Sequence, residues 1–338
     1  MRFVVCGAGA IGGVIGGQLA RAGFEVVLID ANGAHVDAIN RQGLHLKGVH
    51  GAHTLAIPAV REAAAVDWRE GDVVVLAVKS QHTEAAAGAL RRAVGRELPL
   101  FCAQNGVRNE EVAARHFREV NGVMVLLGAK HLVPGEVVHT AKGPLGVGTW
   151  PAGLGDTARE VAAALGKTEL PVYTTEDVRA AKWNKMLLNL NNATMGLTGL
   201  CGQEARATRE VREFMADVYE EGLRVVRAAE IAYEGPPGTG PIEEQIRQLR
   251  GDEPGPPVPA EEELRHYASL WQDLYHRRGE VEADHFNGEI VRLGRQVGVP
   301  TPCSSLLLGL ITEMAAARER PGKYTVAQLR ARLAGLAG

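Results

Sequence analysis

The sequence predicts a parallel α/β domain followed by an all-helical domain. Three observations support this fold class. A strand, a glycine-rich turn, a helix and a second strand lie within the first thirty or so residues, and further apolar strand-like runs continue to residue 174. After that point only helix-like spacing occurs, and 338 residues are enough for two cores. We therefore expect domains at residues 1–175 and 176–338.

Composition and charge exclude several classes of protein. Hydrophobic residues make up 46% of the chain and charged residues 23%, which is typical of a globular protein. The net charge of −3 and the absence of Lys/Arg runs indicate neither a nucleic-acid nor a membrane partner. The four scattered cysteines predict neither a disulfide framework nor a metal site. With an N-terminus that resembles no signal peptide, these features predict a cytoplasmic protein.

The first strand, residues 2–6, leads directly into a GxGxxG turn, and a helix (residues 13–23) and a strand (24–29) follow. In a Rossmann fold the first glycine permits the tight turn, the second admits a pyrophosphate, and the third allows close helix–strand packing. The phosphates then bind free N–H groups at the helix N-terminus. The alternative is a purely structural turn. We predict dinucleotide binding by six residues: Gly7, Ala8, Gly9, Ala10, Ile11 and Gly12.

Asp30 ends the second strand, 18 positions after Gly12. An acidic residue at this point accepts hydrogen bonds from the ribose hydroxyls, and its charge repels a 2′-phosphate. Ala31 follows, where an arginine would favour NADP. The sequence thus favours NAD(H). The alternative is a solvent-exposed aspartate that opens the loop 31–33.

Polar side chains follow two further strands of the predicted sheet. Lys79 comes after the apolar run 72–78, and Asn105 comes after the run 98–103. Ligands bind at the carboxyl ends of strands in open α/β sheets, so we expect both side chains to serve the cofactor or substrate. Either residue alone would be an ordinary loop residue.

The remaining elements are predicted from periodicity and turn signals. Hairpin signals at Pro134-Gly135 and Lys142-Gly143 predict that residues 135–149 form an antiparallel addition at the sheet edge. The other predicted strands are 121–127 and 169–174, and the predicted helices are 156–165, 182–200, 209–229 and 281–297. Residues 234–260 hold seven of the 16 prolines and read as a surface excursion with a short helix at 242–249.

The helix predicted over residues 182–200 carries Lys185, Asn189 and Asn192 on one narrow stripe of an otherwise apolar surface. Polar groups on a buried helix are costly unless a polar partner faces them. Gly196, one turn further on, would let that partner approach closely. The alternative is an amphipathic helix with a hydrated face. Later carboxylates, such as Glu282, are by themselves more often solvated than functional.

These motifs together resemble the ketopantoate reductase (2-dehydropantoate 2-reductase) family over nearly the whole chain. The resemblance depends on GAGAIG at residue 7, VKSQ around Lys79, QNG around Asn105, KWNKMLLN around Lys185, and ASLWQDL and EADHFNGEIVRLG further on. It implies an N-terminal Rossmann domain and an all-α C-terminal domain resembling that of 6-phosphogluconate dehydrogenase. It also implies an active site between the two domains, and NADPH-dependent reduction of ketopantoate to (R)-pantoate in pantothenate and coenzyme A biosynthesis.

The resemblance also assigns roles residue by residue. Lys185 matches the catalytic lysine and proton donor, and Asn189 matches a substrate-binding asparagine. Asn105 matches the residue that contacts nicotinamide and substrate, and Lys79 matches a lysine on the cofactor side. Two residues, Ser269 and Glu282, match those that hold the substrate. Helical second domains of this type often pair, which leaves a homodimer open.

The chain departs from the family pattern at three places. The second asparagine of the pattern, eight residues after the lysine, is Ala193 here, and Asn192 is the candidate. Asp30-Ala31 replaces the arginine after the second strand and favours NADH over NADPH. The spacing from Ser269 to Glu282 is one residue longer than usual. Two alternatives therefore stay open: a reductase of another small 2-keto acid, and a non-catalytic dinucleotide sensor.

Overall fold

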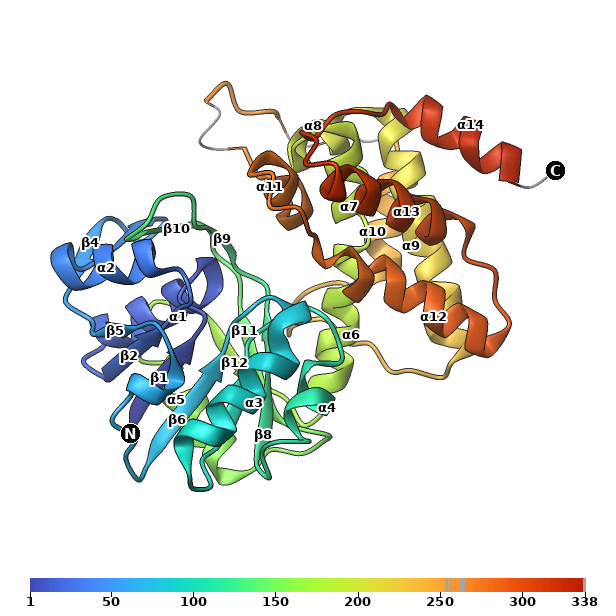
Figure 1. Ribbon diagram of the computed structural model, residues 1–338. Coiled ribbons are helices and arrows are strands. Elements are labelled where there is room, and N and C mark those ends of the chain that lie inside the picture. The colour runs from blue at the N-terminus through green and yellow to red at the C-terminus, as the bar shows by residue number, and fades with distance from the viewer. Residues whose placement is uncertain (253–254, 256, 262–264, 337–338) are drawn as a thin grey trace. The chain divides into compact units, whose positions relative to one another are not determined.

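The computed structural model describes residues 1–252, 255, 257–261 and 265–336 (Figure 1). The chain divides into two compact units, Met1–Lys182 and Trp183–Gly338. The division falls inside helix α6 (Val178–Asn189), whereas the sequence places it at 175/176. Part of the predicted excursion, at positions 253, 254 and 256, lies outside the described residues.

The first unit contains an eight-stranded sheet in the order β12-β11-β8-β7-β6-β1-β2-β5. Its pairs are parallel except for β8 and β11, which are antiparallel. The strands are β1 (Arg2–Cys6), β2 (Glu25–Ile29), β5 (Ala59–Val60), β6 (Asp72–Leu76), β7 (Leu100–Cys102), β8 (Val120–Val125), β11 (Leu145–Thr149) and β12 (Val172–Thr174). The helices are α1 (Ala10–Arg21), α2 (Gly33–Gln42), η1 (Ala63–Ala65), η2 (Ser80–His82), α3 (Thr83–Val94), α4 (Asn109–Ala113) and α5 (Asp156–Leu165). The predicted α/β fold is confirmed.

Both faces of this sheet are covered, which explains the continuous apolar runs in its strands. Phe3 and Val5 of β1 belong to a core that also contains residues of α1 and α5. Val4 and Cys6, on the opposite face, belong to a core that contains residues of α3. Because successive side chains of a strand point to opposite faces, every residue of β1 is buried.

A second sheet of four strands lies beside α1 and was not predicted. Its order is β4 (His53–Leu55), β3 (Leu44–Gly48), β10 (Glu136–Ala141) and β9 (Gly128–Lys130). The prediction that residues 135–149 form one edge addition is therefore wrong for β10. Only β11 joins the main sheet, because the chain passes from one sheet to the other at Gly143. A Cβ atom on Gly143 would lie 2.5 Å from the Leu126 carbonyl oxygen, so the crossing requires glycine.

Helix α1 is packed on two faces, and its glycines make this possible. A Cβ atom on Gly16 would lie 2.9 Å from the Leu28 side chain of the main sheet. On the other face, a Cβ on Gly13 would lie 2.6 Å from Val137 of the second sheet. The two glycine pairs of GGVIGG (residues 12–17) are thus the feature of the sequence that indicates sheets on both sides of α1.

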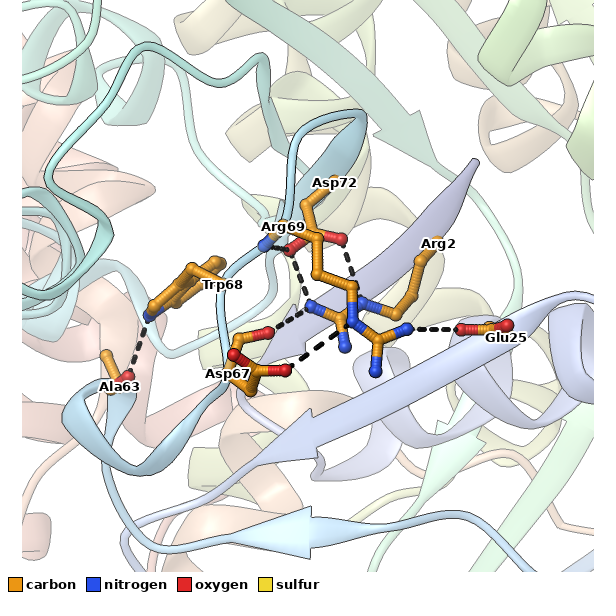
Figure 2. Close-up of polar contacts among 7 residues, drawn as sticks. All are labelled: Arg2, Glu25, Ala63, Asp67, Trp68, Arg69 and Asp72. Carbon is orange, nitrogen blue, oxygen red and sulfur yellow. Dashed lines mark hydrogen bonds and ion pairs between the residues drawn. The ribbon is translucent and has the colours of Figure 1, made fainter.

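A buried ion pair joins the amino ends of β1 and β6 (Figure 2). Arg2 Nε donates to Asp72 Oδ1 at 2.8 Å, and Arg2 Nη2 donates to Asp72 Oδ2 at 2.7 Å. The backbone N–H of Arg69 donates to the same carboxylate, and the Arg69 side chain pairs with Glu25 at the exposed rim. The hydrogen bond to Asp72 raises the pKa of Arg2. Both charged residues at the amino ends of β1 and β6, Arg2 and Asp72, are therefore paired.

All the regular secondary structure described in the second unit is helical (Figure 1). Its elements are the end of α6, α7 (Asn192–Thr198), α8 (Gly202–Ala207), α9 (Arg209–Ala228), α10 (Ile242–Arg250), α11 (Ser269–Tyr275), η4 (Glu282–His285), α12 (Asn287–Val297), α13 (Pro302–Ala316) and α14 (Val326–Leu336). The predicted helix at 242–249 is confirmed as α10, whereas the predicted helix 281–297 is divided at Phe286. No helix among the described residues is long and apolar enough to cross a membrane.

The helix predicted over residues 182–200 is interrupted, so this prediction is wrong in part. Helix α6 ends at Asn189 and α7 begins at Asn192. Side chains from two neighbouring helices satisfy carbonyl groups at the break: Tyr219 of α9 donates to Leu188, and Asn287 of α12 donates to Leu190, both at 3.2 Å. Such side-chain hydrogen bonds replace those that a continuous helix would have made.

Candidate active site

The glycine turn of the first unit has the geometry of a phosphate cradle. Gly7, with φ of 96°, donates its N–H to the Ile29 carbonyl at 2.8 Å. A Cβ on Gly7 would lie 2.7 Å from the Ala77 backbone, and a Cβ on Gly12 would lie 1.9 Å from the Gly7 oxygen. A Cβ on Gly9, by contrast, would meet no atom within 4 Å. Gly9 is the N-cap of α1, so the turn fits a ligand pyrophosphate at the helix N-terminus.

Acidic and basic side chains flank the loop that follows β2. Asp30 Oδ1 accepts the Asn32 N–H at 2.9 Å, which holds the carboxylate at the strand end. Arg61 follows β5 and stands opposite Asp30, since Ile29 pairs with Val60. Its guanidinium binds Asp37 through two hydrogen bonds of 2.9 and 2.8 Å. Sequence reasoning missed Arg61, because the two-residue strand β5 gives no recognisable pattern.

The structure brings the Lys79 and Asn105 turns together. Lys79 is the residue before η2, and Ser80 of η2 donates its hydroxyl to the Asn105 carbonyl at 2.9 Å. Asn109 of α4 donates to the same carbonyl at 2.6 Å. The Asn109 amide oxygen in turn accepts from the Thr83 hydroxyl at 2.7 Å. Buried hydrogen bonds thus fix the backbone on which Asn105 stands.

Lys182 also holds the backbone before Asn105 in place, and sequence reasoning missed this residue. Its ammonium donates to the carbonyl oxygens of Cys102 at 2.9 Å and Gln104 at 3.2 Å, and it forms an ion pair with Glu110. Both charged side chains are buried, with exposures of 4% and 2%. The lysine was visible in the sequence, but its partners lie some eighty positions earlier in the chain. It ties the carboxyl end of β7 to α6.

Three of the predicted substrate-binding residues meet in the second unit. Asn192 Nδ2, at the start of α7, donates to Ser269 Oγ at 3.2 Å and to Asn189 Oδ1 at 3.5 Å. Ser269 begins α11. Lys185 lies one helical turn before Asn189 on α6. The break between α6 and α7 therefore does not separate these polar residues.

Lys185 is an ammonium that the fold withdraws from solvent. Burial lowers its pKa to about 8 from an ordinary value of 10.5. Among the described residues of its unit, none forms an ion pair with it. Glu282, the other residue matched to substrate binding, is 3% exposed at the start of η4.

Gly196 has a packing role, and a polar backbone group approaches it: its carbonyl oxygen accepts the Gly322 N–H at 3.2 Å. A Cβ on Gly196 would lie 2.7 Å from Ile311 of α13 and 3.6 Å from Leu274 of α11. The glycine therefore lets α7 pack closely against apolar side chains of these two helices.

The two units match two parts of one protein family. Residues 3–152 match Ketopantoate reductase PanE/ApbA, and residues 177–315 match its C-terminal counterpart. A solved PanE/ApbA family ketopantoate reductase from Ralstonia eutropha JMP134 is 32% identical with a TM-score of 0.78, covering 94% of this chain and 99% of its own. The chain belongs to the ketopantoate reductase family. It is therefore an NAD(P)-dependent oxidoreductase of the 2-dehydropantoate 2-reductase type.

Two further comparisons agree in length and fold. The 2-dehydropantoate 2-reductase of Pyrococcus abyssi is 29% identical over 312 residues, which are 92% of this chain and 97% of that protein. D-mandelate dehydrogenase, solved with NADH and anilino(oxo)acetate, has a TM-score of 0.77 and covers 98% of this chain and 100% of its own at 22% identity. At that identity the second comparison concerns the fold alone.

Proposed function

We propose that this reductase converts 2-dehydropantoate into (R)-pantoate, with Lys185 as the proton donor and NADH as the preferred cofactor. The observation that carries the proposal is the state of Lys185. It is an ammonium with a pKa of about 8, one turn away from the joined side chains of Asn189, Asn192 and Ser269. No ion-pair partner of Lys185 lies among the described residues of its unit, and neutral hydrogen-bonding groups lie on the next turn. Such a cation suits a substrate that develops negative charge on one oxygen.

The proposed chemistry assigns a task to each group of the second unit. A bound reduced nicotinamide supplies the hydride. The Lys185 ammonium stabilises the charge that develops on the ketone oxygen and then donates its proton. Asn189, Asn192 and Ser269 orient the substrate, and Glu282 accepts a hydrogen bond from its hydroxyl. The lowered pKa brings the donor close to neutral pH, where proton transfer is most effective.

On the cofactor side, the turn 7–12 would hold the pyrophosphate at the N-terminus of α1. Asp30 would accept hydrogen bonds from the adenosine ribose, and its charge disfavours a 2′-phosphate, which supports NADH. Lys79 and Asn105 would contact the nicotinamide half from the carboxyl ends of neighbouring strands.

Initial rates of 2-dehydropantoate reduction, measured in parallel with NADH and NADPH, test this proposal. We expect turnover with both and a higher kcat/KM with NADH. A higher kcat/KM with NADPH would contradict the assignment of Asp30 but leave the reaction intact. A second candidate is reduction of another 2-keto acid, favoured by the longer spacing from Ser269 to Glu282. A panel that includes an aromatic 2-keto acid tests it, and turnover there without 2-dehydropantoate turnover would replace the first proposal.

A further inference from the structure

A buried histidine bridges the dinucleotide turn and the second sheet. His35, in the first turn of α2, has an exposure of 0%. Its Nε2 atom lies 3.0 Å from the carbonyl oxygen of Ala8, inside the glycine turn. Its Nδ1 atom accepts the backbone N–H of Gly135, just before β10, at 2.8 Å. The ring therefore connects the glycine turn to a residue that lies a hundred positions after His35.

The two partners fix the protonation of this ring. A backbone N–H can only donate, so Nδ1 must be unprotonated where it meets Gly135. A carbonyl oxygen can only accept, so Nε2 must carry the hydrogen that Ala8 receives. His35 is thus a neutral imidazole in one tautomer, and both ring nitrogens are satisfied in a site without solvent.

The hydrogen bond to Ala8 also sets the direction of the next amide. The peptide between Ala8 and Gly9 is trans, and in a trans peptide the C=O and N–H bonds point in opposite directions. With its carbonyl directed at His35, this peptide directs the Gly9 N–H away from His35. Gly9 caps α1, and no atom would crowd a Cβ there. An amide so placed can donate to an anion at the helix N-terminus.

We infer that His35 is a positioning residue for the cofactor, which holds the Ala8–Gly9 peptide so that the Gly9 N–H faces the pyrophosphate. The inference rests on the proposed placement of the pyrophosphate at residues 7–12. It also gives the second sheet a function, since Gly135 fixes the tautomer that makes the bond to Ala8 possible. Val137 against Gly13 of α1 keeps the same sheet in contact with the helix.

Two isosteric substitutions separate the two hydrogen bonds. In His35→Gln the terminal amide nitrogen replaces Nε2 and can still donate to Ala8. In His35→Asn the shorter amide replaces Nδ1, so it can accept from Gly135 but does not reach Ala8. The cofactor Kd is measured by nicotinamide fluorescence on the full-length protein without keto acid, and the Tm of each variant checks folding. Initial rates at saturating cofactor give kcat and the KM of the keto acid.

We expect His35→Asn to raise the Kd and KM of the cofactor about tenfold, with kcat and the keto-acid KM within about twofold of the unchanged protein. His35→Gln should restore the cofactor Kd to within about threefold. Equal Kd values for both variants and the unchanged protein would overturn the inference, as would equal losses in both variants. Absence of dinucleotide binding by the unchanged protein would overturn the proposed function as well.

Discussion

A lysine ammonium that is withdrawn from water gives up its proton more readily than one in water, and Lys185 is in this state. Its pKa, lowered by burial to about 8, lies near neutral pH, where a general acid is most effective. No described residue of its unit offsets its charge. In the proposed reaction, the ketone oxygen is the group that this cation would stabilise.

This pKa predicts a pH dependence. The donor must be protonated, so kcat should be constant at low pH and fall by about tenfold per pH unit as the pH rises above about 8. Initial rates at saturating substrate and cofactor measure this limb. The Lys185→Arg variant is the control, because arginine stays protonated throughout the range. If the kcat of Lys185→Arg falls over the same pH range, a group other than Lys185 causes the pH dependence.

Cofactor choice is also decided by individual residues. In the proposed site Asp30 would repel a 2′-phosphate, whereas Arg61 stands opposite it at the end of the neighbouring strand. Replacing Asp30 by serine should therefore raise the ratio of kcat/KM with NADPH to that with NADH by about tenfold or more. Adding Arg61→Ala to Asp30→Ser should remove the gain. An unchanged ratio in Asp30→Ser would show that the ribose lies elsewhere.

At the scale of elements, helices could be predicted where the periodicity and the flanking turn residues lie within the segment itself. Helix α5 begins and ends where expected, and α10 was recognised inside a proline-rich segment. The break between α6 and α7 could not be predicted, because Tyr219 and Asn287, which stabilise it, come from distant helices. The second sheet was missed because β4 and β9 have only three residues each and because β10 pairs in parallel with β3, a strand far back in the chain.

The break between α6 and α7 gives a prediction of its own. Asn287→Ala leaves the Leu190 carbonyl without its partner, which should lower the free energy of unfolding by about 1–3 kcal/mol. It should also lower kcat, because the break sets the position of Asn192 relative to Lys185. Urea unfolding and initial rates measure the two effects. Arg295→Ala, on the exposed side of α12, is the control, and equal effects from both variants would contradict this account.

At the scale of the whole molecule, the candidate site residues carry signals in the sequence, whereas the residues that hold them in place do not. Lys185, Asn189, Asn192 and Ser269 could be named from the sequence because short motifs carry them. Their supports could not be named. Lys182 and Glu110 meet across more than seventy positions, and each looks like a surface residue until the fold buries it.

The buried ion pair Arg2–Asp72 should contribute more to the free energy of unfolding than the exposed pairs around it. Asp72→Ala leaves Arg2 charged and unpaired, which should lower the free energy of unfolding by about 3–5 kcal/mol. Glu25→Ala removes an exposed pair in the same cluster and should cost less than about 1 kcal/mol. Thermal unfolding compares the two (Figure 2). Equal losses of unfolding free energy in the two variants would show that burial does not determine how much an ion pair stabilises this unit.

The central claim is that Lys185 donates the proton, and the measurement that tests it most directly pairs kcat with cofactor affinity in the Lys185→Met variant. Methionine keeps much of the apolar length of the side chain and removes the charge. We expect kcat to fall by about 100-fold or more, while the cofactor Kd stays within about twofold. A cofactor Kd that rises as far as kcat falls would identify Lys185 as a structural residue and contradict the claim.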